Sequence, residues 1–478
     1  MSKPLAIVRC HAAPANYDAF LASKRLAVAP TGIDNPPALA PSLFAFQHDV
    51  TRWALRRGRA ALFADCGLGK GWMALEWARV VAAHTRTPTL IVAPLGVARQ
   101  FVHEAAKLAV PVTLCRGQED VRGGINVTNY ERLHRFTPHV FAGVVLDESS
   151  ILKDYASATR NALIEAFAAT PFRLCCTATP APNDYMELGN HAEFLGVMTR
   201  SEMLAMFFTH DGGETQTWRL KGHAEATFWR WVANWAVAIT KPSDLGYVDD
   251  GYVLPRLSIR QHVVPCGPDV ARQLGMLFAT EVQTLGAQRA ARRGSLETRV
   301  ATAAALIRAD PQPWICWCDL NAESAALTAA IPGAIEVTGS MDADEKERRI
   351  WEFIEGRAHV LVTKPSIAGH GLNLQMCARV AFVGITHSFE AWYQAIRRTY
   401  RFGQTRRVEC HLITSEAEGA VLANLTRKQH GAERMSRAMS AAMADITRAE
   451  LGQQGRDVTD YRPTAQLEVP SWLAPENQ

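Results

Sequence analysis

Short apolar runs alternate with longer amphipathic stretches along most of this chain, and that alternation restricts the fold more than any other feature. A strand, a helix and a second strand in succession build a parallel sheet with right-handed crossovers. The apolar runs of the first half occupy residues 60–64, 89–93, 144–146 and 174–177. Those of the second half occupy residues 314–318, 334–337, 360–362, 380–383 and 408–413. The sequence therefore predicts two α/β halves, each built on a parallel sheet.

Changes in residue composition along the chain also predict its division into domains. Residues 1–40 are rich in Ala and Pro, and we expect an irregular lead-in there. We expect a first lobe over residues 41–255, a second lobe over residues 256–450, and a tail over residues 451–478. Residues 196–255 are rich in Trp and Phe without a clear period. They predict an aromatic-rich helical module between the lobes, with most of its rings in a core.

The composition is that of a soluble globular protein and excludes a membrane-spanning one. Hydrophobic residues make up 48% of the chain, yet no apolar run is long enough to cross a bilayer, and the first ten residues lack the apolar stretch of a signal peptide. The ten cysteines show no C-x-x-C spacing, so we expect reduced thiols rather than a zinc site. A net charge of +4 is too small to indicate nucleic-acid binding by itself. We expect a cytoplasmic protein.

A glycine turn follows the first apolar run directly and leads into a helix. Successive backbone N–H groups in such a turn, together with the helix dipole, can surround phosphate oxygens. Glycines let the backbone approach the ligand closely, and Lys70 would place its ammonium on the β- and γ-phosphates. Gly67, Leu68, Gly69, Lys70 and Gly71 therefore form either an ATP site or a glycine turn with a surface lysine, and the motifs that follow must decide between the two.

Gly71 departs from the usual form of this phosphate loop. The pattern expects Ser or Thr after the lysine, because that hydroxyl is a ligand of Mg²⁺. One hypothesis is a chain that binds nucleotide without efficient turnover and serves as a scaffold. The other is a working but slowed ATPase, because water can fill the vacant coordination position of Mg²⁺. We favour the ATPase, since the other charged residues of the site are all present.

Two carboxylates follow the apolar run that ends at Leu146. Asp147 and Glu148 would lie at the carboxyl edge of a parallel sheet, where α/β folds bind ligands. Asp147 would hold Mg²⁺ through water, and Glu148 would polarise the attacking water. The pair therefore predicts the hydrolytic end of the same ATP site.

The second half contains a polar and basic segment with helical spacing. Gln394, Arg398 and Arg401 recur at steps of four and three residues, so on a helix they would share one face. Two guanidinium groups facing a phosphate can neutralise the charge that develops on the transferred γ-phosphoryl group. An upstream basic segment, Arg289, Arg292 and Arg293, would either contact a phosphate backbone or form a solvated helix face.

These segments resemble, in the family's order, the motifs of superfamily-2 helicases and translocases, in the Swi/Snf-like form of bacteriophages and prophages. The resemblance covers roughly residues 41 to 450 and implies two RecA-like lobes of the P-loop NTPase class that clamp one ATP. Its motifs are found at residues 93–95, 128–131, 147–150, 177–180, 314–323, 366–374 and 394–404. Arg398 and Arg401 match the arginine fingers of the family.

The resemblance also implies further contacts. Gln47 occupies the place of the glutamine that reads adenine, and Gly371 and Gln394 would lie beside the nucleotide. Residues of the family's nucleic-acid motifs correspond to Pro94, Asn129, Tyr130, Thr177, Thr179 and Asn373.

The implied activity is that of an ATP- and Mg²⁺-dependent DNA helicase or translocase. Swi/Snf-like motors track duplex DNA, so we expect duplex rather than single-stranded DNA as partner, and a monomer that acts in phage or prophage DNA metabolism. Phage replication or recombination proteins are the candidate partners, and no membrane is expected. The alternatives are the nucleotide-binding scaffold described above and a DNA-independent P-loop phosphotransferase, such as a small-molecule kinase.

Overall fold

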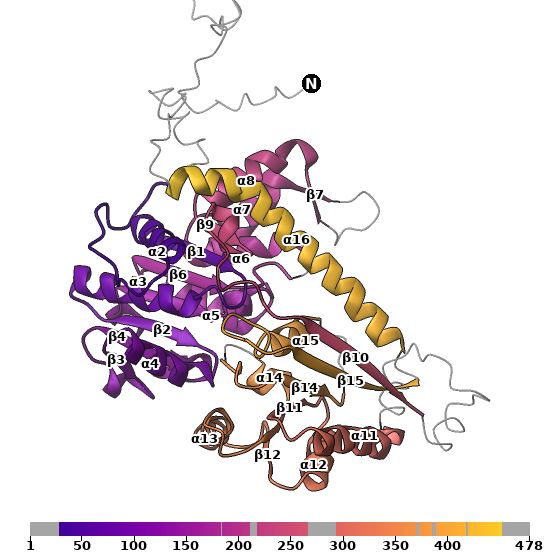
Figure 1. The fold of residues 1–478 in the computed structure, drawn as a ribbon. Coiled ribbons are helices and arrows are strands. Elements are labelled where there is room, and N and C mark those ends of the chain that lie inside the picture. Colours follow the sequence, from indigo (N-terminus) through magenta and orange to yellow (C-terminus); the bar gives the residue numbers. More distant parts are fainter. Residues whose placement is uncertain are drawn as a thin grey trace, which may run out of the picture.

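The computed structural model describes residues 28–182, 184–210, 218–265, 293–369, 372–384, 389–416 and 419–451. These residues build two separate parallel sheets and a two-stranded hairpin (Figure 1). The prediction of two α/β lobes, each with a parallel sheet, is confirmed. Gly371, Arg289 and Arg292, for which the sequence predicted contacts, lie outside the described residues.

The first lobe is built on a seven-stranded sheet in the order β3-β4-β2-β5-β6-β1-β9. Its strands are β1 (Arg59–Ala64), β2 (Thr89–Ala93), β3 (Val112–Leu114), β4 (Ile125–Asn129), β5 (Gly143–Asp147), β6 (Phe172–Thr177) and β9 (Ala236–Ile239). All neighbouring pairs run parallel. Strand β6 lies between β1, which leads into the phosphate loop, and β5, which ends at Asp147. The two predicted halves of the ATP site therefore meet at one edge of the sheet.

Helices cover both faces of this sheet. They are α2 (Ala45–Arg57), α3 (Lys70–Thr85), α4 (Val97–Lys107), α5 (Ala158–Ala166), α6 (Leu188–Leu195), α7 (Arg200–Phe207) and α8 (Glu225–Ala233). Alternate residues of β1 point to opposite faces, with Leu62 packing on the side of α2 and α3 and Phe63 on the side of α6 and α8. Because both faces are covered, the strands read as continuous apolar runs in the sequence.

Short 3-10 helices connect these elements and carry several residues of the predicted motifs. They are η1 (Gln118–Asp120), η2 (Tyr130–Arg135), η3 (Pro138–Val140), η4 (Ser149–Leu152), η5 (Tyr185–Glu187), η6 (Gly222–Ala224) and η7 (Pro242–Leu245).

The aromatic-rich module differs from its prediction as a purely helical insertion. Besides α7 and α8 it contains the antiparallel hairpin β7 (Phe208–His210) and β8 (Trp218–Leu220), and strand β9. Strand β9 pairs with β1, so the module completes the first lobe, within whose predicted bounds it lies. The prediction that its rings are mainly core is confirmed, because Trp231 and Trp235 are fully buried against the first sheet.

The second lobe is built on a six-stranded sheet in the order β10-β15-β14-β11-β13-β12, again with all neighbours parallel. Its strands are β10 (Leu257–Val264), β11 (Trp314–Trp317), β12 (Ala334–Val337), β13 (Val360–Thr363), β14 (Arg379–Phe382) and β15 (Val408–Ser415). Helices α11 (Leu296–Ala309) and α12 (Asn321–Ala330) pack on one face. The other face is covered by α13 (Ala343–Ile354), α14 (Pro365–Ala368) and α15 (Phe389–Ile396).

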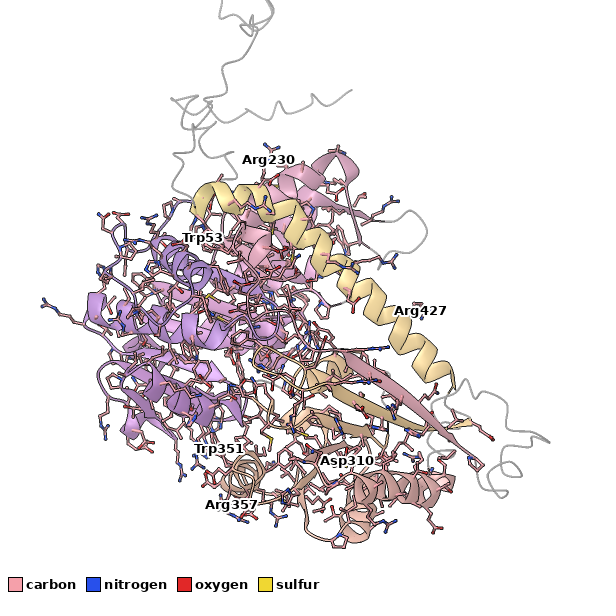
Figure 2. All side chains as sticks on the ribbon, in the orientation of Figure 1. Trp53, Arg230, Asp310, Trp351, Arg357 and Arg427 are labelled. Atoms are coloured by element: carbon pink, nitrogen blue, oxygen red, sulfur yellow. The ribbon has the colours of Figure 1, made fainter. Side chains whose placement is uncertain are left out.

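The last helix, α16 (Gly419–Leu451), crosses from the second lobe back to the first (Figure 1). Met439 and Met443 are buried in the first lobe's core on the side of α8. Near its end, the Glu450 carboxylate accepts hydrogen bonds from Trp53 Nε1 and Arg57 Nη2, both at 2.8 Å, and Trp53 lies beside the last turns of α16 in Figure 2. The helix therefore ties the end of the second lobe to the back of the first. None of the described helices combines the length and the apolar character needed to span a bilayer.

A buried histidine in the second sheet predicts a loss of stability in acid. His411 Nδ1 lies 2.9 Å from His262 Nε2 on the neighbouring strand. Burial, reinforced by His262, lowers the pKa of His411 from 6.5 to about 4. An unfolded chain would take up the proton near pH 6.5 and the folded chain only near pH 4, so stability is lost as the pH falls through this window.

We expect the free energy of unfolding to fall by on the order of 1–3 kcal/mol between pH 6.5 and pH 4 on account of this residue. His411→Asn should lose less stability over the same range, as measured by urea denaturation at several pH values. His359→Asn, at an exposed position, is the control. An unchanged pH slope in His411→Asn would contradict the assignment.

Candidate nucleotide-binding site

A cavity of about 340 Å³ lies between the two lobes and contains residues of both. Cavities of this volume accept small ligands. The first lobe contributes Gln47, Gly67, Gly69, Lys70, Gly71, Asp147 and Glu148, among others. The second lobe contributes Asn373, Gln375, Arg398, Arg401 and Phe402. The structure therefore brings the predicted phosphate loop, the carboxylates and both arginines to one cavity.

The phosphate loop connects the end of β1 to the start of α3. Gly67 and Gly69 have φ values of 93° and 81°, which side chains rarely adopt. A Cβ on Gly69 would lie 2.2 Å from Gln47 Nε2, and one on Gly67 would lie 2.7 Å from the backbone nitrogen of Phe402. Lys70 Nζ donates to the carbonyl oxygens of Ala64 at 2.6 Å and Asp65 at 3.2 Å. The loop thus presents the N-terminus of α3 to the cavity, as anion binding requires.

Gly71 lies in the first turn of α3 and faces open space. A Cβ there would meet only the Phe101 ring, at an ordinary contact distance of 3.7 Å. Its backbone is helical, so neither strain nor crowding requires a glycine at this place. The missing hydroxyl could therefore be supplied by substitution without disturbing the loop.

Gln47 lies at the wall of the cavity, where its amide supports the loop. Its Nε2 donates to the carbonyl oxygen of Leu68 at 3.0 Å, and its Oε1 accepts from the backbone N–H of Phe44 at 3.1 Å. The side chain is buried, so these two bonds join the start of α2 to the phosphate loop. Contact with a base stays a prediction.

The carboxylate pair ends β5 inside the cavity. Asp147 and Glu148 are only 6% and 7% exposed. Burial, and then the charge of Glu148, raises the pKa of Asp147 to about 7, although Lys70, Arg398 and Arg401 act in the opposite direction. An acid held in this way is typical of functional sites.

Glu148 carries two further signs of a functional residue. Its φ of 53° places it in the left-handed region, which is unusual for a residue other than glycine. Its buried Oε2 has no hydrogen-bond partner among the described residues, and its Oε1 lies 3.8 Å from Arg398 Nη2. A strained backbone and an unpartnered buried oxygen are both costly, and such features concentrate at active sites.

Arg398 approaches the carboxylates from the second lobe. Its side chain is 2% exposed, with Nε donating to the carbonyl oxygen of Gln394 at 2.9 Å and Nη2 donating to Gln394 Oε1 at 2.7 Å. Arg401 donates through Nη1 to the carbonyl oxygen of Leu372 at 3.3 Å, while its buried Nε has no partner among the described residues. Burial, and then the positive charge of Arg398, lowers the pKa of Arg401 to about 10. Two guanidinium groups this close repel each other unless an anion lies between them.

The helix predicted through these arginines is shorter than expected. Helix α15 ends at Ile396, so Arg398 and Arg401 lie in the turns that follow it. The Gln404 side chain holds these turns by donating to the carbonyl oxygens of Gln375, Cys377 and Thr399 at 2.9–3.1 Å. The arginines converge through this tertiary anchor and not through one helical face.

Several residues predicted to bind nucleic acid make internal contacts in this conformation. Asn129 is 3% exposed, and its side chain accepts from the backbone N–H of Arg132 at 3.0 Å. The Tyr130 hydroxyl donates to the carbonyl oxygen of Asp147 at 2.7 Å. Pro94 is half-buried after β2. These contacts connect the predicted motif to the predicted ATP site, and binding of nucleic acid stays a prediction.

The remaining predicted nucleic-acid residues lie where the lobes meet. Thr177 is buried at the end of β6 and accepts from the backbone N–H of Thr179 at 3.1 Å. Thr179 Oγ1 in turn accepts from Gln394 Nε2 of the second lobe at 3.4 Å. Asn373 donates through its backbone N–H to Gln100 at 2.9 Å and through Nδ2 to Glu104 at 3.1 Å, both on α4. Arg293, at the described end of the predicted basic segment, is exposed.

Three aromatic residues that the sequence analysis missed line the same cavity. Tyr252 and Phe402 stack with ring centroids 4.6 Å apart, and Phe44 meets each of them edge-on at 5.9 Å. Phe44 and Phe402 stand next to predicted motifs and could have been found by that position. Tyr252 belongs to an irregular segment that gives no signal in the sequence.

Comparison with known protein families gives a match within the second lobe. Residues 319–403 match the family described as the helicase conserved C-terminal domain. This is less than a fifth of the chain, and it contains Asn373, Arg398 and Arg401. The second lobe is therefore similar to helicase C-terminal domains over the stretch that faces the cavity.

One solved structure to which this chain is similar is the Sulfolobus solfataricus SWI2/SNF2 ATPase core in complex with dsDNA. It is 18% identical, and the match covers 87% of this chain and 98% of that chain with a TM-score of 0.41. No curated protein sequence matches this chain. Function must therefore be argued from the site itself.

The two glycines of the loop predict opposite responses to a methyl group. Gly69→Ala should lower the free energy of unfolding by about 1–3 kcal/mol, because φ is positive and the new Cβ would collide with Gln47. Gly71→Ala should leave it unchanged or raise it by up to about 1 kcal/mol, because the position is helical and open. Urea denaturation of both variants checks this pair, and equal effects would contradict the described loop.

Proposed function

We propose that this chain is an ATP-dependent motor of the superfamily-2 helicase and translocase type, which couples hydrolysis of Mg-ATP to movement on DNA. The observation that carries the proposal is the convergence of Lys70, the carboxylate pair and the two arginines on one cavity between the lobes. Phosphoryl transfer requires little more than such positioned charges. The helicase C-terminal match over residues 319–403 supports the same conclusion.

In this proposal the first lobe binds the nucleotide. Backbone N–H groups of residues 67–71 and the ammonium of Lys70 hold the phosphates, and Gln47 lies near the base. The cavity's buried carboxylate oxygens suit Mg²⁺, which prefers oxygen ligands, and Asp147 would hold the ion through water while it neutralises phosphate charge. Because Gly71 offers no hydroxyl, water would have to supply the ligand that Ser or Thr provides in the usual loop.

Glu148 and the two arginines then act on the terminal phosphate. The unpartnered Glu148 Oε2 is free to accept a hydrogen bond from the attacking water. Arg398, which is buried, and Arg401, which is half-buried, are like charges beside the cavity, and a γ-phosphate between them would relieve their repulsion. The arginines would therefore interact more favourably with the transition state than with the nucleotide-free cavity.

Coupling to DNA would follow from contacts that join the lobes. Gln394 touches Thr179 of the first lobe, and Asn373 touches α4, so a change in lobe separation reaches the loops after β6 and β2. We propose Pro94, Asn129, Tyr130, Thr177, Thr179 and Asn373 as residues of the DNA track. Duplex tracking by a monomer in phage or prophage DNA metabolism is the form that the sequence resemblance suggests.

The first test compares ATP hydrolysis with duplex DNA, single-stranded DNA and RNA. We expect stimulation by duplex DNA. Arg398→Ala should lower kcat by about 10²-fold or more with a small change in the KM for ATP, because a finger acts in the transition state. Arg357→Ala is the matched control, since Arg357 is exposed and lies far from the cleft in the second lobe (Figure 2). Turnover that no nucleic acid changes would favour a DNA-independent phosphotransferase instead.

The second test concerns Gly71, the residue on which the alternative scaffold hypothesis rests. We expect measurable turnover in the wild type, and a several-fold rise together with a lower Mg²⁺ requirement in Gly71→Ser, because the added hydroxyl can be a direct ligand. Mg²⁺ titrations of the steady-state rate measure both effects. No turnover in the wild type and turnover in Gly71→Ser would support the scaffold and contradict the motor.

A further inference from the structure

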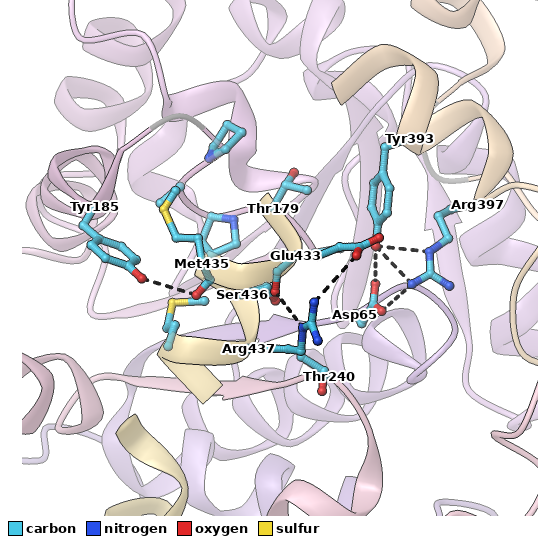
Figure 3. A pocket seen from close by; sticks show the side chains of 15 residues that line it. Asp65, Thr179, Tyr185, Thr240, Tyr393, Arg397, Glu433, Met435, Ser436 and Arg437 are labelled. Carbon is cyan, nitrogen blue, oxygen red and sulfur yellow. Dashed lines mark hydrogen bonds and ion pairs between the residues drawn. The ribbon is translucent and has the colours of Figure 1, made fainter. Parts of the chain in front are cut away.

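A half-buried ion pair joins the phosphate loop to the second lobe. Arg397 Nη2 lies 2.5 Å from Asp65 Oδ2, and the two side chains are 17% and 22% exposed. The Tyr393 hydroxyl donates to Asp65 Oδ1 at 3.0 Å and accepts from Arg397 Nε at 3.1 Å. Figure 3 shows the three side chains pointing toward one another. We call Asp65, Tyr393 and Arg397 the Asp65 cluster.

The Asp65 end of this cluster is part of the phosphate loop itself. The same carboxylate accepts the backbone N–H of Cys66 at 2.6 Å, and the Asp65 carbonyl accepts from Lys70 Nζ at 3.2 Å. A displacement of the Asp65 carboxylate would therefore move the loop that holds the phosphates. The second lobe reaches this carboxylate with Arg397 and Tyr393.

The other end of the cluster belongs to the segment that carries the two finger arginines. Arg397 directly precedes Arg398, yet the two side chains point to different partners, Asp65 in one case and Gln394 with Glu148 in the other. Arg398 and Arg401 line the nucleotide cavity, whereas Arg397 does not. Arg397 lines a neighbouring cavity of about 250 Å³, together with Thr179, Glu433 and Arg437 (Figure 3).

The Asp65–Arg397 pair is less exposed than another ion pair between the lobes. Arg116 and Asp344 also join the lobes at 3.0 Å, but they are 62% and 56% exposed, and such surface pairs contribute little. The Asp65–Arg397 pair is much less exposed, so loss of one partner leaves a charge that water reaches only in part, which is unfavourable. Burial acts to lower the pKa of Arg397, but Asp65, Tyr393 and Cys66 together outweigh burial and raise that pKa. The Asp65 cluster is thus a strong candidate for fixing the relative position of loop and fingers.

We propose that the Asp65 cluster positions Arg398 and Arg401 over the nucleotide by locking the end of α15 to the phosphate loop, with Arg397 as a positioning residue that does not touch the nucleotide. This inference rests on the proposed function, since it assigns a regulator of finger placement in that same site. Because misplacement of a catalytic group by about 1 Å can cost about 10²-fold in rate, the cluster would control kcat without binding substrate.

The kinetic test uses single and double variants. Arg397→Met should lower kcat for ATP by about 10- to 100-fold while the KM changes by less than about threefold, because the nucleotide contacts remain. Tyr393→Phe should lose less, and Arg397→Lys should recover part of the rate. Asp65→Asn combined with Arg397→Met should be no slower than the worse single variant, because both remove one interaction. Reductions in kcat that add in the double variant would overturn the proposal. So would a rise in KM as large as the fall in kcat.

A second measurement does not depend on hydrolysis. Small-angle X-ray scattering of the nucleotide-free protein should give a larger radius of gyration for Arg397→Met than for the wild type, because the lobes lose the ion pair that joins them. Arg357→Met, an exposed arginine of the same lobe that pairs with its neighbour Glu355, is the control. Equal radii for wild type and Arg397→Met, with circular dichroism showing both folded, would overturn the lock. Absence of ATP turnover in the wild type would instead reject the proposed function, and the scattering comparison would still decide the cluster.

Discussion

The rest of this structure depends on opposite charges, buried or half-buried, that face each other across one cleft. Asp147 and Glu148 end a strand of the first lobe, and Arg398 and Arg401 face them from the second. Each set is unfavourable alone, as the raised pKa of Asp147 and the lowered pKa of Arg401 show. The attraction between the two sets therefore favours the arrangement in which the lobes face each other. A triphosphate with Mg²⁺ would bring further balancing charge into the same space.

The backbone around this cleft is shaped for a close ligand. Gly67 and Gly69 adopt conformations that side chains rarely tolerate, and they leave no room for a Cβ against Phe402 and Gln47. Gly71 is different, since nothing in the fold requires it. The loop thus combines two structural glycines with one position where chemistry, and not packing, decides the residue.

Local sequence features predicted much of this arrangement, whereas contacts between distant parts of the chain were not predicted. Lys70 was predictable because it ends the glycine turn that follows an apolar strand, Asp147 because it directly follows an apolar run, and Arg398 because residues 394–404 resemble a motif of the family. The end of α15 at Ile396 was not, because the bonds of Gln404 that hold the following turns reach carbonyls distant in the chain. The Asp65–Arg397 pair joins residues 332 positions apart, and no local pattern announces it. Strand β9 was missed because four residues inside an aromatic stretch carry too little periodicity.

A crystal structure with Mg²⁺ and a non-hydrolysable ATP analogue tests the central claim most directly. The account predicts one γ-phosphate contacted by the Lys70 ammonium from the first lobe and by the guanidinium groups of Arg398 and Arg401 from the second. A nucleotide bound by the first lobe alone, with both arginines directed away from its phosphates, would contradict it.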